Sequence, residues 1–301
     1  MKDLLIIGST AFDTIITPTQ RRDYIIGGSA SHAAYGAAFF TKTRLCGIVG
    51  SDWTPEHTKL FTDRGIAVDD LEIRPDGKTF FWMGEYSQDM NIRTTLETQV
   101  NVLGEFSPNL TPASRRSPYL FLANGSPVTQ MQAIDQCTEL KFVVADTMNF
   151  YIASQRAELL ELLKKIDGLV LNDEESEMLT GKKDIFAAAE QLCGMGPRFV
   201  IIKKGAHGSL YFSPTALFTL PAYPTRKLAE PTGAGDCFAG AMMGYIAGKD
   251  ATDIQTIKTA IAYGTVAASF TVEDFSFDAL KRCTREDIDA RFREFQEMLR
   301  F

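Results

Sequence analysis

Residues 230–241 read Glu-Pro-Thr-Gly-Ala-Gly-Asp-Cys-Phe-Ala-Gly-Ala, and this stretch decides how the rest of the sequence is interpreted. The small apolar residues that continue to Ile246 predict a tightly packed helix, with the glycines and Asp236 at its N-terminus. Free N–H groups and the helix dipole make such a terminus a site for phosphate. Because a phosphate would repel a carboxylate, Asp236 is a candidate to accept the proton of an attacking hydroxyl. A glycine-rich turn with a capping aspartate is the alternative.

The composition is that of an ordinary globular protein. The chain has 301 residues, of which 45% are hydrophobic and 23% charged, enough for one large α/β domain or two smaller ones. The net charge of -7 gives no electrostatic reason to bind nucleic acid or an anionic membrane. Five scattered cysteines lack metal-ligand spacing, and no apolar run suits a signal or membrane-spanning segment. We therefore expect a cytoplasmic protein with reduced thiols.

Buried-type apolar runs alternate with helical segments along most of the chain. This alternation predicts an α/β fold with a mostly parallel sheet that helices cover on both faces. Ligand sites in such folds lie at the carboxyl ends of the strands, and polar residues follow several of these runs. The predicted strands are residues 4–8, 45–50, 119–123, 142–146, 168–172 and 199–203.

Two segments interrupt the alternation and have the pattern of hairpins. Residues 14–26 contain β-branched residues around a turn, and residues 71–97 contain a Pro-Asp-Gly turn between apolar runs. Together they predict a small antiparallel sheet, built from insertions at about 13–26 and 71–99, that covers the strand ends as a lid. Its aromatic residues would form the core of the lid, a dimer surface or a wall for substrate.

Asn172 and Glu175 lie three residues apart where a predicted strand gives way to a helix. Their side chains can therefore converge on one ligand, and their oxygen atoms suit Mg²⁺ held through water. The same spacing is that of a capping box, in which Asn172 caps the helix and Glu175 reaches back to it. Both interpretations remain open at this point.

Four motifs in this order resemble the ribokinase-like, or PfkB, family of carbohydrate and nucleoside kinases, over essentially the whole chain. The C-terminal signature of that family matches residues 230–236, and its Gly-Gly signature matches Gly27 and Gly28. Its magnesium motif matches Asn172 to Glu175, and its substrate-contacting aspartate matches Asp13. The resemblance implies a single ribokinase-like domain over residues 1–301, with a three-layer α/β/α core and the β-sheet lid.

The resemblance also implies a phosphotransferase that moves the γ-phosphoryl group of ATP onto an alcohol. Asp236 would be the general base, and Asn172 and Glu175 would order Mg²⁺ and its waters. The implied anion hole consists of the N–H groups of Gly233, Ala234 and Gly235. The implied ATP-binding residues are Thr232, Lys204, Gly205, Gly208 and Gly235. The implied acceptor-binding residues are Asp13, Gly28, His32, Asn124, Arg93 and Asn149.

Two positions depart from the family pattern. His32 stands where many relatives have an asparagine that helps to hold the sugar, so an imidazole would replace that contact. Glu230-Pro231 stands where the usual pair is Asp-Thr, at a site that binds a monovalent cation in relatives. Glu230 can still offer oxygen to K⁺, although Pro231 lacks an N–H.

Three functions stay open. The main interpretation is an ATP-dependent kinase that acts on a sugar, a sugar acid or a cyclitol. The second is a nucleoside kinase of the adenosine-kinase kind, in which Phe81 or Trp82 of the lid would stack on a base. The third is a noncatalytic nucleotide-binding protein, against which the intact Asp236, Asn172 and Glu175 argue. A monomer and a homodimer joined through the lid are both open.

Overall fold

A nine-stranded sheet forms the centre of the computed structural model, which describes residues 2–90 and 92–300. The strand pairs from β11 to β5 are parallel, and β12 and β13 add an antiparallel end. The order is β13 (Ala216–Leu220), β12 (Ser209–Ser213), β11 (Phe199–Lys203), β10 (Gly168–Asn172), β9 (Phe142–Asp146), β8 (Tyr119–Leu122), β1 (Leu4–Ile7), β4 (Thr43–Val49) and β5 (Ala67–Ile73).

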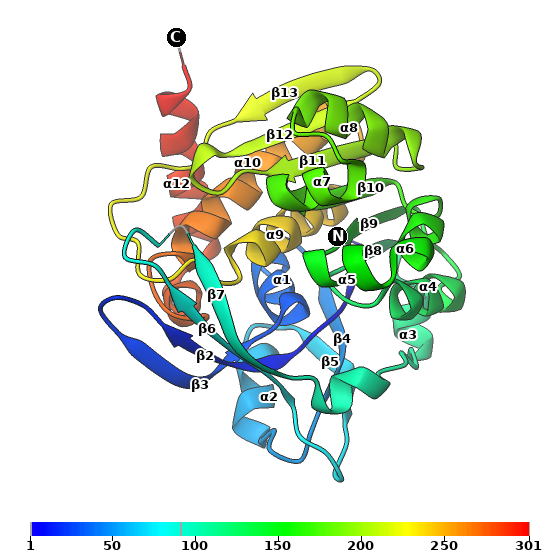
Figure 1. Cartoon of the computed structure of the whole chain (residues 1–301), viewed down its shortest axis with the longest axis vertical. Helices are drawn as coiled ribbons and strands as arrows, with labels where there is room; N and C mark the ends of the chain where they lie inside the picture. The colour runs from blue at the N-terminus through cyan, green and yellow to red at the C-terminus, as the bar shows by residue number, and fades with distance from the viewer. Residues whose placement is uncertain (1, 91, 301) are drawn as a thin grey trace.

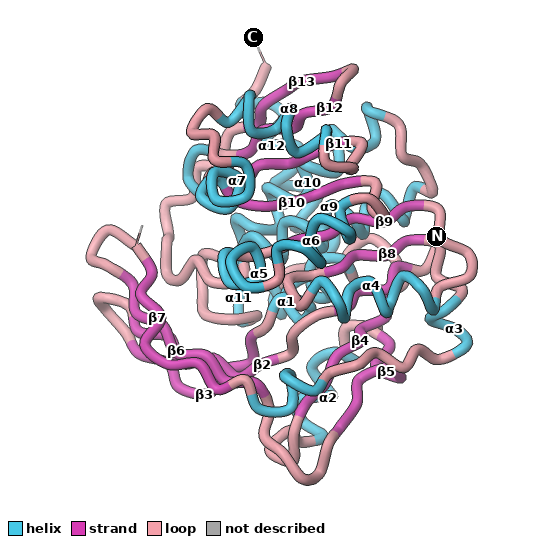
Figure 2. Tube along the Cα trace, turned by 45° about the vertical axis from the view of Figure 1, so that its right-hand side comes forward, coloured by secondary structure: helices cyan, strands magenta, loops and turns pink. Residues whose placement is uncertain are grey.

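Helices cover both faces of this sheet, as Figures 1 and 2 show, so the predicted three-layer α/β/α core is confirmed. Side chains alternate between the faces along each strand. In β11, for example, Phe199 and Ile201 pack on one side, and Val200 and Ile202 pack on the other. The first face holds α1 (Ser29–Ala37), α2 (Pro55–Thr62), α9 (Ala234–Lys249), α10 (Ile254–Thr271), α11 (Asp278–Arg282) and α12 (Arg285–Met298). The second face holds α4 (Pro127–Gln136), α5 (Asn149–Ser154), α6 (Arg156–Leu163), α7 (Asp173–Thr180) and α8 (Ile185–Gly194). The other helical segments are α3 (Pro112–Arg115) and two 3₁₀ helices, Asn101–Glu105 and Gly205–His207.

Close packing of α1 against α9 fixes where the N-terminus of α9 lies. Glycines of α9 let the two backbones approach: a Cβ added at Gly240 would lie 2.0 Å from the carbonyl oxygen of Ala33. At Gly244 an added Cβ would lie 2.6 Å from the carbonyl oxygen of Ala37. The small-residue pattern of α9 therefore serves packing, and it holds the predicted anion site against α1.

We expect Gly240→Ala to lower the free energy of unfolding by about 2 kcal/mol, because a methyl group forced against backbone overpacks the interface. Urea unfolding measures this difference as a lower midpoint at an unchanged slope. Gly194→Ala is the matched control, since a Cβ at that helical glycine meets open space. Equal stability of the two variants would contradict the packing argument.

A second sheet of four strands forms the lid, and its pairing differs from the expected antiparallel one. Its order is β3 (Arg21–Gly27), β2 (Ala11–Ile16), β6 (Phe80–Tyr86) and β7 (Arg93–Gln99). The outer pairs are antiparallel, but β2 and β6 are parallel, so the sheet is mixed. The second insertion also begins later than residue 71. Residues 71–73 belong to β5, which pairs with β4 because Leu71 packs against the main core.

One edge of the lid sheet is open to solvent. Every residue of β7 is exposed, and β7 is an edge strand of the lid. An exposed edge strand is able to pair with another chain, and a homodimer through the lid stays a prediction.

Within residues 2–90 and 92–300, no helix combines the length and the apolar content needed to cross a bilayer.

Candidate active site

The N-terminus of α9 has the backbone that the glycine motif predicts. Gly233 precedes the helix with a φ of 76°, a left-handed conformation that favours glycine. A Cβ at Gly233 would also lie 2.4 Å from Nδ1 of His32, so the ring occupies the space beneath this residue. Of the N–H groups at the start of this 16-residue helix, that of Ala234 donates to the carbonyl of Pro231 at 3.2 Å, whereas those of Gly233 and Gly235 have no acceptor among the described residues. The loop therefore needs glycine at residue 233, because any side chain there would clash with the His32 ring.

Asp236 lies in the first turn of α9 and is half-buried. Burial raises the pKa of Asp236 to about 7, the Asp146 carboxylate adds to the rise, and Lys203 and Arg93 oppose it. A carboxylate with a pKa near neutrality is suited to take a proton from a hydroxyl. The geometry therefore fits the general base that the sequence predicts.

Asp13 lies in β2, on the face of the lid that is turned toward the core. Its carboxylate packs against Gly27, where an added Cβ would lie 1.9 Å from Oδ2. Burial raises the pKa of Asp13 well above its usual range, Glu230 and Asp236 add to the rise, and Arg93 opposes it. The structure thus brings four of the predicted residues into one electrostatic cluster.

Gly28 and Asn124 lie close together, since Oγ of Ser29, the residue after Gly28, donates to the carbonyl oxygen of Asn124 at 2.9 Å. Gly28 has a φ of 96°, and an added Cβ would lie 2.5 Å from the carbonyl oxygen of Ser9. Asn124 donates a hydrogen bond from Nδ2 to the sulfur of Met148 at 2.9 Å, whereas its buried Oδ1 has no partner among the described residues. The unpartnered oxygen gives Asn124 a free acceptor for a ligand hydroxyl.

Other predicted residues have mainly local contacts in the structure. His32 is 2% exposed and packs on Phe277 at 4.6 Å between ring centroids, and burial lowers its pKa to about 4. Its neutral ring therefore supports Gly233 from below. Asn149 accepts a hydrogen bond from the N–H of Phe150 at 2.8 Å and is exposed. Lys204, Gly205 and Gly208 form the tight turn between β11 and β12, which the Lys204 N–H closes on the carbonyl of Gly208 at 2.8 Å.

Asn172 and Glu175 form the capping box at the start of α7. The Glu175 N–H donates to Oδ1 of Asn172 at 2.8 Å, and the Asn172 N–H donates to Oε2 of Glu175 at 2.7 Å. Burial raises the pKa of Glu175 to about 7. Within the described ranges, no three His, Cys, Asp or Glu side chains gather around one metal position. The pair fits a hydrated Mg²⁺ that takes its other ligands from water and phosphate.

Glu230 is 1% exposed, and its carboxylate accepts a hydrogen bond from the N–H of Thr232. Burial raises its pKa to about 7. The hydrogen bond from the Thr232 N–H stabilises the charged form of this carboxylate. Glu230 therefore holds the glycine loop in place without a bound cation. A K⁺ site needs several converging oxygens, and the recorded contact of the Glu230 carboxylate is with an N–H donor. K⁺ at Glu230 stays a prediction.

Two contacts of the site had no signal in the sequence. Tyr86 of the lid and Thr232 of the glycine loop share a hydrogen bond of 2.7 Å between their hydroxyl oxygens. Lys203, at the end of β11, donates from Nζ to Oδ2 of Asp146 at 2.7 Å. The first contact joins residues 146 positions apart, and the second joins the ends of β11 and β9, which lie on either side of β10 in the sheet. Contacts between residues that are distant in the sequence leave no local sequence pattern.

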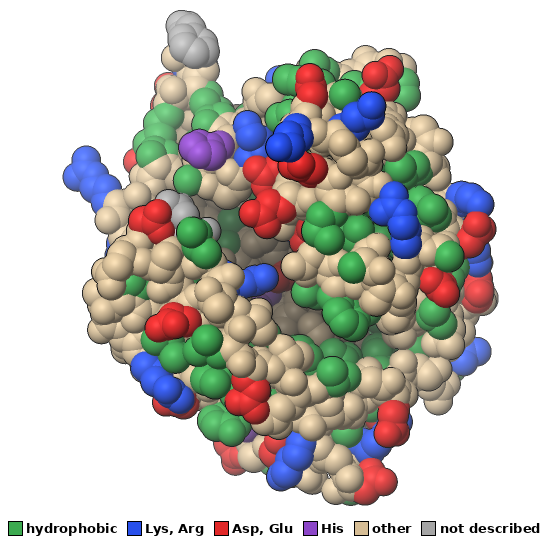
Figure 3. All heavy atoms as spheres, viewed as in Figure 1, with side chains coloured by type: hydrophobic (Ala, Val, Ile, Leu, Met, Phe, Trp, Pro, Cys, Tyr) green, Lys and Arg blue, Asp and Glu red, His purple; other side chains and the backbone are tan. Residues whose placement is uncertain are grey.

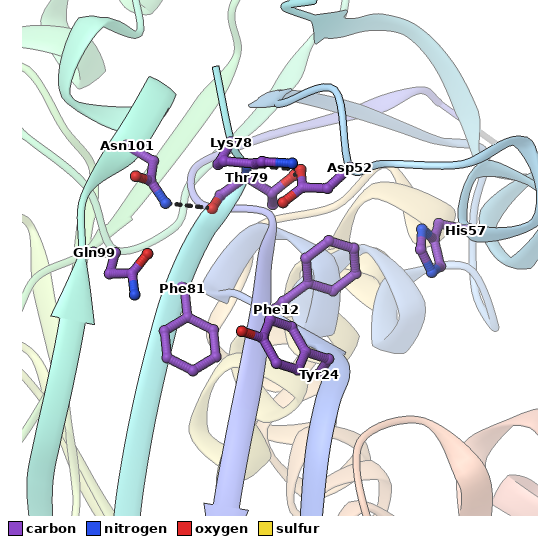
Figure 4. A pocket seen from close by; sticks show the side chains of 9 residues that line it. All are labelled: Phe12, Tyr24, Asp52, His57, Lys78, Thr79, Phe81, Gln99 and Asn101. Atoms are coloured by element: carbon purple, nitrogen blue, oxygen red, sulfur yellow. Dashed lines mark hydrogen bonds between the residues drawn. The ribbon is translucent and has the colours of Figure 1, made fainter.

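The space-filling view shows a hollow between the lid and the core (Figure 3). It lies over the region where Figure 1 places β6, β7 and the start of α9. A separate cavity of about 450 Å³ lies on the opposite face of the lid, where Phe12, Tyr24 and Phe81 gather (Figure 4). Since Asp13 and Phe12 are neighbours in one strand, their side chains point to opposite faces. That cavity is therefore not the candidate active site.

The comparison with protein families agrees with this geometry. A model described as the pfkB family of carbohydrate kinases matches residues 1–280. The chain belongs to the PfkB family. As a member, it is a phosphotransferase that uses an alcohol as acceptor, and the sequence-based expectation of such an enzyme is confirmed.

Relatives of this PfkB-family kinase include enzymes named for nucleosides. A cytidine kinase of Thermococcus kodakarensis is 29% identical over 255 residues, which are 82% of this chain and 88% of the relative. A nucleoside kinase of Methanothermobacter thermautotrophicus is 28% identical over 292 residues, 91% of this chain and 90% of the relative.

The fold is shared with solved ribokinase-like structures. An Escherichia coli structure described as a ribokinase II in complex with ATP and Mg²⁺ superposes with a TM-score of 0.77. The match has 15% identity and covers 98% of this chain and all of that one. The ribokinase-like architecture of this PfkB-family kinase, with its lid, is thereby confirmed.

Proposed function

We propose that this PfkB-family kinase transfers the γ-phosphoryl group of ATP to a hydroxyl of a nucleoside. The observation that carries the proposal is the position of Trp82 beside Asp13: the two residues are register partners in β6 and β2, so their side chains share one face of the lid. Phe81 is paired with Phe12 on the other face. Of the two aromatic residues considered for stacking on a base, Trp82 is therefore the one turned toward the site.

The ring of Trp82 is held in place for stacking. Its Nε1 donates a hydrogen bond to Oγ1 of Thr95 at 3.2 Å, and the Arg93 guanidinium lies 5.3 Å from the ring centroid. Trp82 and Met90 also pack against a small apolar cluster of Ile15, Tyr86 and Phe275. A free sugar offers mainly hydroxyls, whereas a nucleobase offers a flat apolar face that matches this wall.

In the proposed reaction, Asp13 orients the acceptor and Asp236 takes the proton of its attacking hydroxyl. The N–H groups of residues 233–235 stabilise the charge of the transferring phosphoryl group. Asn172 and Glu175 would hold the waters of Mg²⁺, which would neutralise charge at the phosphates when it is bound. ATP and Mg²⁺ are thus the proposed cosubstrate and cofactor.

An acceptor panel tests the proposal. ADP release is measured with MgATP and either cytidine, uridine, adenosine and inosine, or ribose, fructose and myo-inositol. We expect kcat/KM for one nucleoside to exceed that for every sugar and cyclitol at least tenfold. A sugar or cyclitol as the best acceptor would restore the main interpretation made from the sequence, which the family description supports as the second candidate.

Trp82→Ala is expected to raise KM for the nucleoside by about tenfold or more, since stacking of a base on an aromatic ring contributes ~1–3 kcal/mol. Phe81→Ala is the matched control, because it removes a neighbouring ring from the opposite face of the same strand. Steady-state kinetics and melting temperatures are measured for both. Equal effects on KM would show that the lid, and not a stacking contact, accounts for the change.

A further inference from the structure

Lys203 is a cation in the centre of the site to which the sequence assigned no role. It is the last residue of β11 and lies on the same side of the sheet as Phe199 and Ile201, which is the side of α9. Its register partner in β10 is Asn172. Lys203 therefore lies between the two predicted halves of the phosphate site.

The ammonium group of Lys203 is held by a hydrogen bond to the buried carboxylate of Asp146. One hydrogen bond of 2.7 Å joins Nζ to Oδ2 of Asp146, and the other oxygen of that carboxylate accepts from the N–H of Thr147 at 2.8 Å. The side chain of Asp146 is 3% exposed, whereas that of Lys203 is 19% exposed. An ammonium has three N–H donors, and no second acceptor is recorded for this one in residues 2–90 and 92–300. The open side of the ammonium can therefore meet a ligand.

Burial acts to lower the pKa of Lys203, but the carboxylates of Asp146, Glu175 and Asp236 outweigh it and raise the pKa above its usual value. Lys203 thus stays charged at every pH at which the enzyme would be assayed. A permanently charged, partly desolvated ammonium interacts with phosphate oxygens more strongly than a solvated one.

The position of Lys203 relative to the glycine loop decides what it can do. A Cβ added at Gly235 would lie 3.3 Å from Nζ of Lys203. The ammonium therefore stands directly beside the N–H groups of the predicted anion hole. We infer that Lys203 is a catalytic residue, whose ammonium binds an equatorial oxygen of the phosphoryl group during its transfer.

In that step the acceptor oxygen bonds to the γ-phosphorus and the bond from phosphorus to the β,γ-bridging oxygen breaks. The electron pair of the broken bond leaves with ADP, and the hydroxyl proton goes to Asp236. Negative charge on the transferring group then faces Lys203 on one side and the start of α9 on the other. Donors placed in this way before the reaction stabilise the transition state more than the bound substrate.

A purely structural ion pair is the competing explanation, in which Lys203 only neutralises Asp146. Three variants separate the two: Lys203→Met, Asp146→Asn, and the double variant that carries both changes. We expect Lys203→Met to lower kcat by about a hundredfold or more, as loss of one such donor does. The double variant removes the unpaired buried carboxylate, so its melting temperature should recover while its kcat stays low. Recovery of kcat in the double variant would overturn the inference.

Binding of a transition-state mimic gives a second measurement that needs no acceptor. Titration calorimetry compares MgADP alone with MgADP plus aluminium fluoride for each variant. We expect aluminium fluoride to tighten binding at least tenfold in the parent enzyme and less than twofold in the double variant. Lys165→Met, which breaks a surface ion pair with Asp135, should behave like the parent. Equal tightening in all proteins, or none in the parent, would contradict the role of Lys203.

The inference rests on the proposed function only through the acceptor used for turnover. If the acceptor panel shows a sugar instead of a nucleoside, the Lys203 experiments proceed with that sugar and the inference is tested unchanged. If Lys203→Met turns over like the parent with any acceptor, the inference fails while the proposed function stands.

Discussion

Asp236→Asn is expected to lower kcat at least a hundredfold and to leave the Kd for MgATP within about twofold. Asparagine keeps the shape of the side chain but cannot accept the hydroxyl proton, and general-base catalysis contributes ~10²–10⁴-fold to rates. Equilibrium binding of MgATP and steady-state turnover with the best acceptor measure the two quantities. Near-normal turnover of the asparagine variant would remove Asp236 from the mechanism.

The pH dependence of the same residue supplies an independent check. Burial, followed by the Asp146 carboxylate, raises the pKa of Asp236 to about 7, and Lys203 and Arg93 oppose the rise. Asp236 is therefore protonated, and unable to act as a base, in acid. We therefore expect kcat/KM to fall about tenfold per pH unit below pH 7. Any base with a lower pKa would keep kcat/KM constant down to about pH 5.

The free energy of unfolding of the parent enzyme should fall as pH rises, which is opposite to the change in kcat/KM. Because the folded-state pKa lies above the unfolded value of ~4, the group contributes its stability fully below about pH 4 and loses it as pH rises through 7. Asparagine is neutral throughout. The melting temperature of Asp236→Asn minus that of the parent should therefore be larger at pH 8 than at pH 5. A difference that does not vary with pH would show that burial does not perturb Asp236.

The sequence was sufficient for six parallel strands of the main sheet, because these strands are largely buried on both faces and are therefore apolar runs. They are β1, β4, β8, β9, β10 and β11. The lid was harder to predict, because pairing between strands distant in sequence leaves no local pattern. Residues 71–73 resemble one arm of a hairpin, yet they join β4, since Leu71 finds apolar partners in the main core. The parallel pairing of β2 with β6 is equally invisible from either strand alone.

Lys203 shows how a residue of the site can be missed and how it could have been found. Lys203 and Lys204 are neighbours at the end of a strand, and composition does not say which one is inside. The two-residue period of a strand does: Phe199, Ile201 and Lys203 share one face. The position of α9 over that face then places Lys203 beside the glycine loop. Only the second step needed the structure.

Gly233→Ala is expected to lower kcat about a hundredfold, the second large effect. Two independent features oppose a side chain at this position: the left-handed φ of 76°, which costs about 1–2 kcal/mol without glycine, and the His32 ring at 2.4 Å from the new methyl group. Either the loop or the ring must move, and the N–H groups of residues 233–235 would then miss the phosphoryl oxygens. Turnover and MgADP binding separate a misplaced loop from lost nucleotide affinity.

Removal of the ring tells the two features apart. In a protein with both His32→Ala and Gly233→Ala, the methyl group gains room while the φ stays strained, so kcat should recover partly from the Gly233→Ala value. His32→Ala alone is the necessary control, because it leaves a cavity beside Phe277. If the double variant is no better than Gly233→Ala, backbone strain alone disables the loop. If His32→Ala alone raises KM for the acceptor, the imidazole contacts substrate as the sequence comparison implied, and its support of Gly233 is not its only role.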